Sequence, residues 1–211
     1  MTKIGIIGAG NIGGAIARGL VTHGNIDANN VVISRRKPEM LNSFVKLGIN
    51  ATTSNKELVS NCGVVILAVL PGQAEAIVSD IFPLLDPEKH ILVSVVSGVS
   101  MQELESWVEK KVPVVRIMPN TAVEFGESMT CIAGNDPGAE QTIQEIFEPM
   151  GSTLIILEKL MPAATILAAC GIAFFLRFIR AETQGGIQIG FHASEAGRIA
   201  AQTAKGAAQI L

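Results

Sequence analysis

The sequence has few cysteines, and none is placed where a metal site would need it. Cys62, Cys131 and Cys170 are far apart, with neither a C-x-x-C motif nor a nearby pair of histidines. We therefore expect no metal, and three free thiols in a reducing compartment. Runs of Lys or Arg are also missing. Sixteen basic against nineteen acidic residues give a formal charge of −3, so nucleic acid is not an expected partner.

Signals for export or membrane insertion are missing as well. A strand pattern begins at Lys3, with no basic region, apolar stretch and cleavage site before it, so we expect a cytoplasmic protein. One uncharged run, Leu160–Leu176, is 17 residues long, just under the ~18 expected of a spanning helix. Arg177 and Arg180 follow it, and it is rich in small residues. We expect a buried helix, such as one at a subunit interface, and no membrane span.

Strands and helices alternate along most of the chain. Hydrophobic residues make up 48% and charged residues 17%, which suits buried parallel strands. Strands are expected at Lys3–Ile7, Val31–Ser34, Val64–Val69, Ile91–Val95, Val114–Met118, Glu127–Ala133 and Thr153–Leu157. Helices are expected at Ile12–Val21, Pro38–Leu47, from about Gln73, at Met101–Val108, and from the turn Asn135–Gly138 to Met150. The alternation predicts an α/β protein with a doubly wound, mostly parallel sheet.

After Glu158 the pattern becomes helical and Ala-rich, broken by Gly185, Gly186 and Gly190. We therefore expect a dinucleotide-binding domain over residues 1–158 and a smaller all-α domain, for substrate binding and dimerisation, over residues 159–211. Small residues at Ala163, Ala164, Ala168, Ala169 and Gly171 allow close helix approach. A largely apolar helix must bury more than one stripe, so we expect at least a homodimer.

The first strand is followed by a glycine-rich turn that opens a helix. Gly8-Ala9-Gly10-Asn11-Ile12-Gly13 fits G-x-G-x-x-G within a βαβ unit, the context that identifies a Rossmann-type dinucleotide site. Gly8 allows the tight turn, Gly10 lets the backbone approach a pyrophosphate, and Gly13 lets the helix pack on the strand. A plain tight turn is the alternative.

The second strand ends in Ser34-Arg35-Arg36, where NAD-binding proteins place an acidic residue that holds the ribose 2′-hydroxyl. A hydroxyl and two guanidinium groups suit a 2′-phosphate instead, since Arg can bind phosphate through paired hydrogen bonds. The sequence therefore predicts NADP(H) as the cofactor. Two solvated arginines on a loop are the alternative.

Several motifs along the whole chain together resemble the pyrroline-5-carboxylate reductase family. Besides the fingerprint with Asn11, they are Ala68–Pro71, Ser94–Ser100, Arg116–Ala122, Glu158, Thr165, Gly171–Ala173, Ala181, Gly190-Phe191 and Gln202–Ala208. The resemblance implies NADPH-dependent reduction of the cyclic imino acid 1-pyrroline-5-carboxylate to L-proline, the last step of proline synthesis.

The resemblance also implies roles for individual residues. It places Asn55 near the adenosine ribose phosphate, and Ala68, Val69, Pro71 and Ser97 along the cofactor path. Asn120 and Glu158 would lie near the nicotinamide and the substrate. From the residues alone, Asn120 could form a turn after Pro119, and Glu158 could cap the following helix.

Two segments depart from the family pattern. Ala169-Cys170-Gly171-Ile172-Ala173 replaces a Gly-Ser-Gly-Pro-Ala segment, which leaves Cys170 and Gly171 as substrate-side candidates. Cys170 could be a nucleophile, but a buried inert thiol is the stronger expectation. Ile172 in place of proline permits an uninterrupted helix, and Leu70 replaces a lysine of the family.

The family also continues past residue 211 with a Ser-Pro-Gly-Gly-Thr-Thr type segment that binds the substrate carboxylate. If 211 residues is the natural length, we expect half of the substrate site to be missing; if it is a fragment, we expect the parent to be a reductase. The alternatives to an active reductase are an NADP(H)-binding protein without turnover, and a related hydride-transfer enzyme such as a β-hydroxyacid dehydrogenase or a deazaflavin-dependent NADP reductase. No Gly-rich helix with a catalytic Lys, normal in the dehydrogenase, follows Glu158.

Overall fold

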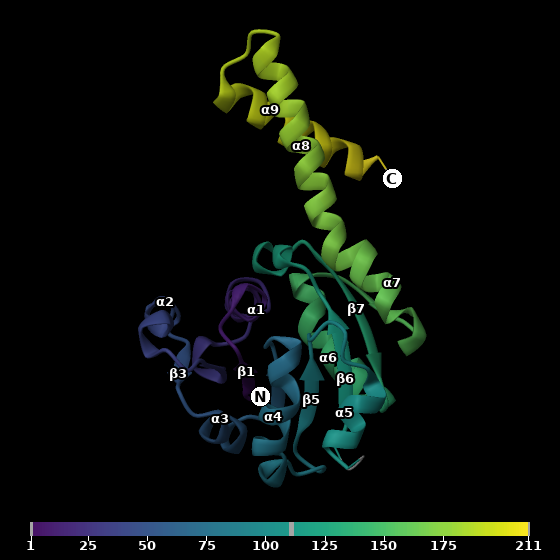
Figure 1. Ribbon diagram of the computed structural model, residues 1–211. Coiled ribbons are helices and arrows are strands. Elements are labelled where there is room, and N and C mark those ends of the chain that lie inside the picture. The colour runs from purple at the N-terminus through teal and green to yellow at the C-terminus, as the bar shows by residue number, and fades with distance from the viewer. Residues whose placement is uncertain (1, 110–111, 211) are drawn as a thin grey trace. The chain divides into compact units, whose positions relative to one another are not determined.

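The computed structural model describes residues 2–109 and 112–210. The chain forms two compact units (Figure 1), an α/β unit over Met1–Ala169 and a helical unit over Cys170–Leu211. The α/β unit is built on one eight-stranded sheet with the order β3-β2-β1-β4-β5-β6-β7-β8. Neighbouring strands run parallel, except β6 and β7, which run antiparallel. The predicted doubly wound, mostly parallel sheet is confirmed.

The strands are short, and β1, β2, β4 and β6 are buried from end to end. The strands of the sheet are β1 (Ile4–Ile7), β2 (Val31–Ser34), β3 (Asn50–Thr52), β4 (Val64–Leu67), β5 (Ile91–Ser94), β6 (Val114–Met118), β7 (Ser128–Gly134) and β8 (Gly151–Ile155). The order of β3 to β6 in the sheet is that of dinucleotide-binding folds, in which the ligand lies outside the carboxyl ends of the strands where the strand order reverses. That point is the crevice between β1 and β4.

Helices cover both faces of the sheet because successive strand side chains point to opposite faces. Ile4 and Ile6 of β1 belong to one apolar cluster with α1 and α6, whereas Ile7 belongs to the other with α3, α4 and α5. The α-helices of this unit are α1 (Asn11–Thr22), α2 (Asn42–Val45), α3 (Asn55–Asn61), α4 (Pro71–Ile81), α5 (Met101–Trp107), α6 (Pro137–Phe147) and α7 (Met161–Ala164). Short 3-10 segments include η4 (Thr121–Phe125) and η6 (Glu158–Leu160), and the π-helical segment η7 spans Thr165–Cys170.

Two elements were not predicted, β3 and α3. They lie between the second and third expected strands, in a polar stretch without clear periodicity. The expected helix Pro38–Leu47 is also shorter than predicted: it divides into a 3-10 turn, Pro38–Leu41, and α2. Gly48, with a φ of 80°, follows it as expected of a helix-ending glycine.

The helical unit consists of α8 (Gly171–Gln188) and α9 (Ala193–Gln209), which cross each other (Figure 1). Contact between them runs through small residues: a Cβ at Gly186 would lie 3.0 Å from the Cβ of Ala196. Most of the apolar surface of α8 is left uncovered within the chain. Its exposed large apolar side chains are Phe174, Phe175, Leu176, Phe178 and Ile187.

In the single chain most of the run Leu160–Leu176 is exposed, so its expected burial, such as at a subunit interface, stays a prediction. Only Met161, Ala164, Ala168 and Gly171 of this run are buried. Met161, Ala164 and Ala168 pack in an apolar cluster with residues of β6 and β7, whereas most of the remaining side chains of the run are exposed. Burial of the rest requires a partner surface.

An ion pair joins α1 to η4, the segment that follows β6. Arg18 donates two hydrogen bonds to Glu124, at 2.7 and 2.9 Å, and lies over the ring of Phe44. The hydrogen bonds from Arg18 hold the pKa of Glu124 below its ordinary value of 4.5. The pair fixes the turn that begins at Asn120.

Replacing Glu124 by Gln is expected to lower the free energy of unfolding by about 1 kcal/mol at pH 7. A carboxyl group whose pKa is lowered by folding stabilises the protein above its unfolded-state pKa, and this contribution is lost as pH falls through the folded-state value. The difference from wild type should therefore shrink at about pH 3. Urea unfolding at both pH values measures it. The exposed Glu127→Gln is the charge-matched control, and an equal loss in both variants would contradict the prediction.

Candidate functional site

The glycine-rich turn between β1 and α1 has a backbone that only glycines allow. Gly8 has a φ of 108°, and a Cβ there would collide with the carbonyl of Ala68. A Cβ at Gly13 would collide with the carbonyl oxygen of Gly8. The turn is held against the second strand by a 3.0 Å hydrogen bond from the Gly8 N–H to the Ser34 carbonyl.

Gly10 differs from these two glycines, because a Cβ on it would meet nothing within 4 Å. It is the N-cap of α1 and supplies no side-chain hydrogen bond, so the first N–H groups of the helix have no acceptor from the cap. Free N–H groups at a helix start attract an anion. The open space beside Gly10 therefore fits a pyrophosphate that would approach the turn, with Asn11 and Ile12 at its edge.

The end of β2 is joined to the glycine turn and to α3. Ser34 is buried, and its hydroxyl donates a 2.7 Å hydrogen bond to Oδ1 of Asn55. The Arg35 guanidinium donates to the carbonyl of Ala9, and the backbone N–H of Arg35 donates to the Thr52 carbonyl. Arg36 is exposed and has no ion-pair partner among the described residues. The structure thus brings these predicted residues together on one side of the turn.

The predicted residues after β4 and β5 lie along the same edge of the sheet. Ala68 is 7% exposed, and its N–H donates to the carbonyl of Ile7 at 2.8 Å. The Val69 side chain approaches Gly8, and Pro71 starts α4. Ser97 follows β5 in an exposed loop, with its hydroxyl 4.0 Å from the Met118 sulfur. Ala68, Val69 and Pro71 follow β4, the strand beside β1, and Ser97 follows β5, the next strand in the sheet.

Asn120 follows β6 and takes part in four hydrogen bonds, one of them from the Val123 N–H to its carbonyl at 3.1 Å. Its N–H donates to the Ser128 hydroxyl, and its Oδ1 accepts from the N–H of Ala122 at 2.9 Å, so it caps η4. Its Nδ2 donates to the carbonyl of Ala168 in the π-helical segment at 3.1 Å. The turn-forming role expected from the residues alone is thereby confirmed. A second Nδ2 hydrogen has no acceptor among the described residues.

Glu158 makes contacts that the sequence did not predict. Its Oε1 accepts from the Arg116 guanidinium at 2.5 Å and from the backbone N–H of Met101 at 3.1 Å. Arg116 lies in the middle of β6, and only 7% of its side chain is exposed. A charged residue inside an otherwise apolar strand was the signal for this pair.

The remaining substrate-side candidates, Cys170 and Gly171, lie where the helical unit begins. Gly171 is buried, whereas Cys170 is exposed, so the expectation of a buried thiol there is wrong. The buried thiols are those of Cys62 and Cys131. Burial raises the pKa of Cys62 to about 11, which leaves it protonated and unreactive at neutral pH.

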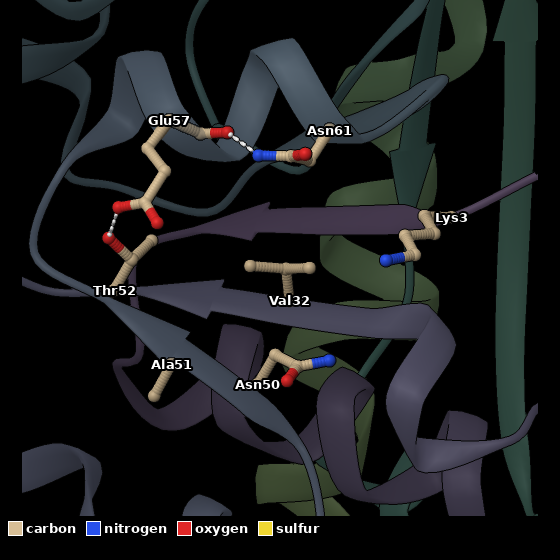
Figure 2. A pocket seen from close by; sticks show the side chains of 7 residues that line it. All are labelled: Lys3, Val32, Asn50, Ala51, Thr52, Glu57 and Asn61. Carbon is tan, nitrogen blue, oxygen red and sulfur yellow. Dashed lines mark hydrogen bonds between the residues drawn. The ribbon is translucent and has the colours of Figure 1, made fainter.

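A polar pocket of about 240 Å³ lies between α3 and the strands β2 and β3 (Figure 2). Its polar groups largely bind one another. Thr52 bonds the Glu57 carboxylate, Asn61 donates to the Glu57 carbonyl, and Asn50 donates to the Asn29 carbonyl. None of its lining residues belongs to the glycine turn, and we assign no ligand to it.

Comparison with known proteins identifies the family. Residues 3–98 match a family model described as NADP oxidoreductase, coenzyme F420-dependent, and residues 158–211 match the pyrroline-5-carboxylate reductase dimerisation model. Pyrroline-5-carboxylate reductase 2 of Dictyostelium discoideum is 40% identical over 99% of this chain and 76% of that protein. The chain belongs to the pyrroline-5-carboxylate reductase family. This confirms the resemblance inferred from the ordered motifs.

Other members of the pyrroline-5-carboxylate reductase family differ in length. Pyrroline-5-carboxylate reductase 1 of D. discoideum is 43% identical. The matched region covers 99% of this chain but 40% of that protein. A crystal structure of the Plasmodium falciparum enzyme with NADP bound superimposes with a TM-score of 0.88 at 27% identity, covering 99% of this chain and 78% of that one. The enzyme of Streptococcus pyogenes gives a TM-score of 0.85 at 28% identity, covering 100% and 79%.

Proposed function

We propose that this protein catalyses the NADPH-dependent reduction of 1-pyrroline-5-carboxylate to L-proline. The observation that carries the proposal is the convergence of the glycine turn, the Arg35–Arg36 pair and Asn120 at the carboxyl ends of the strands, in a chain of this family. Open space beside Gly10 supports a pyrophosphate there. The cation-rich end of β2 supports the 2′-phosphate of NADP(H) over a free hydroxyl.

The chemistry asks the protein mainly to hold two molecules in position. NADPH supplies the hydride when it is bound. The substrate's C=N bond is protonated on nitrogen, and its carbon accepts the hydride. The π electrons become the lone pair of the nitrogen, so that a secondary amine is formed. The chain must orient the ring and exclude water. Asn120, whose side chain is already fixed by two hydrogen bonds and keeps one amide hydrogen, is our candidate for a contact near the nicotinamide.

We also propose that the protein works as a homodimer in a reducing, cytoplasmic setting. Free thiols at Cys62, Cys131 and Cys170 support the setting. The stretch Glu158–Gln188 is long and apolar enough to cross a membrane by length and composition alone, and 17% of its most apolar window is buried. The match of residues 158–211 to a dimerisation model supports a second copy, and not lipid, as the cover.

Consumption of NADPH by the purified 211-residue chain with 1-pyrroline-5-carboxylate tests the proposal. Turnover with NADPH preferred over NADH is the expected result. No turnover despite NADPH binding would contradict it, and would favour the cofactor-binding protein without turnover. Detection of proline by chromatography distinguishes imine reduction from any other NADPH oxidation.

Arg36→Gln is expected to raise the KM for NADPH at least about tenfold and to leave the KM for NADH unchanged. A hydrogen bond to a charged group contributes about 1.5–3 kcal/mol, and NADH lacks the 2′-phosphate that would receive it. Steady-state kinetics with both cofactors measures the effect. Lys37→Gln removes a neighbouring exposed cation and serves as the control. Equal losses with both cofactors, or in both variants, would contradict the assignment.

A further inference from the structure

The carboxylate of Glu158 joins three segments of the α/β unit. Through Oε1 it binds Arg116 of β6 and the N–H of Met101 at the start of α5, and it is itself the first residue of η6. Its Oε2 is buried and has no hydrogen-bond partner among residues 2–109 and 112–210. One oxygen of the carboxylate is therefore hydrogen-bonded within the protein, and the other is shielded from water.

Stability alone does not explain such a pair. The Arg116 side chain is almost fully removed from water, whereas 36% of the Glu158 side chain stays exposed. Removing a charge from water commonly costs more than its ion pair returns, and an apolar side chain of similar size often stabilises a core better. Arg116 is nearly buried between β5 and β7, where an apolar residue would pack without this cost. The ion pair instead fixes the relative position of the three segments, because its hydrogen bonds are directional.

The segments that meet at Glu158 carry residues of the proposed site. Asn120 lies four residues after Arg116, and the loop with Ser97 leads into α5 at Met101. Residues 158–168 are tied to this strand region at both ends: Glu158 binds Arg116, and the Ala168 carbonyl accepts from Asn120. Ala168 lies in a π-helical segment, a feature that often marks functional sites.

We propose that Arg116 and Glu158 are positioning residues for the reduction. They hold residues 158–168 and the loop 97–100 so that Asn120 and Ser97 keep the geometry that hydride transfer requires. Glu158 then acts through Arg116 and Met101, and not by contact with the substrate. The inference rests on the proposed function and adds to it a means of orienting the substrate side.

The double variant Arg116→Met/Glu158→Leu tests this role, because it replaces the pair with apolar side chains and leaves no uncompensated buried charge. We expect it to fold, to bind NADPH with an unchanged Kd, and to lose about 100-fold in kcat, the size of effect that a displacement of about 1 Å can produce. Asp86→Leu/Lys89→Met, which removes an exposed ion pair joined at 3.0 Å, is the matched control with unchanged kcat. Wild-type kcat in the Arg116→Met/Glu158→Leu variant would overturn the proposal.

Two single variants keep the test decisive if the double variant does not fold. Glu158→Gln retains the Oε1 acceptor, so its kcat should be at least about tenfold higher than that of the double variant. Glu158→Asp keeps the charge but shortens the reach, and should lose about tenfold. A Gln variant as poor as the double variant would overturn the proposal, since it would mean that the carboxylate itself is required at the substrate.

Hydrogen exchange separates failure of this inference from failure of the proposed function. With NADPH bound, amides in residues 158–168 and 97–100 should exchange at least about tenfold faster in Glu158→Asp than in wild type. This readout requires no turnover. Unchanged exchange would overturn the positioning role even in an inactive protein, whereas inactivity of wild type with the expected exchange would count against the proposed reaction only.

Discussion

Replacing Gly10 by Ala is expected to weaken NADPH binding about 100-fold while leaving the fold intact. A Cβ at this position meets no protein atom within 4 Å, so the methyl group itself disturbs nothing in the chain. It would occupy the space through which a pyrophosphate reaches the N–H groups of α1. Loss of two charge-assisted hydrogen bonds, about 3 kcal/mol together, corresponds to the expected factor.

The neighbouring glycine gives the contrasting control. Gly13→Ala would force a Cβ against the Gly8 carbonyl, so it should lower the melting temperature as well as cofactor affinity. Gly206→Ala also adds a methyl group in open space, but far along the sequence in α9, and should change neither. Fluorescence titration with NADPH and thermal unfolding separate the three. An unchanged Kd in Gly10→Ala would mean that no phosphate approaches this turn.

The sequence predicted most of the sheet because buried parallel strands consist of unbroken apolar runs. Val64–Leu67 is one such run, and all four of its residues are buried. The glycine turn was equally visible, since Gly8 and Gly13 stand at positions where close backbone contacts leave no room for a Cβ. Elements at the edge of the sheet have neither an unbroken apolar run nor a diagnostic glycine spacing. The strand β3 has only three residues, Asn50–Thr52, none of them buried, and its pairing with β2 decides its structure.

The substrate side was harder to predict because its contacts join residues far apart in sequence. Asn120 reaches Ala168 across 48 positions, and Arg116 reaches Glu158 across 42. Nothing in the local pattern around Glu158 distinguishes a carboxylate that caps its own helix from one that binds a buried arginine in another strand. For Leu160–Leu176, apolarity predicts burial but does not say whether the same chain or a second copy covers the run.

The double variant Phe175→Asp/Phe178→Asp is expected to convert the protein into a monomer. These side chains are 73% and 75% exposed in the single chain and lie three residues apart, on one face of α8. Burying charges in their place at a self-complementary interface affects both copies at once. A loss of at least about 4 kcal/mol raises the dimer Kd about 1000-fold or more. Light scattering and sedimentation over a concentration series measure it.

The control substitution for this variant lies on the same helix. Gln184 lies nine residues after Phe175, about half a turn around a helix of 3.6 residues per turn, and is exposed. Gln184→Asp should leave the assembly unchanged, because it adds a charge on the opposite face. A dimer that survives in the Phe variant would place the interface elsewhere on the chain. Flotation of wild type with phospholipid vesicles, abolished in the Phe variant, would identify lipid as the cover of this face and contradict the homodimer.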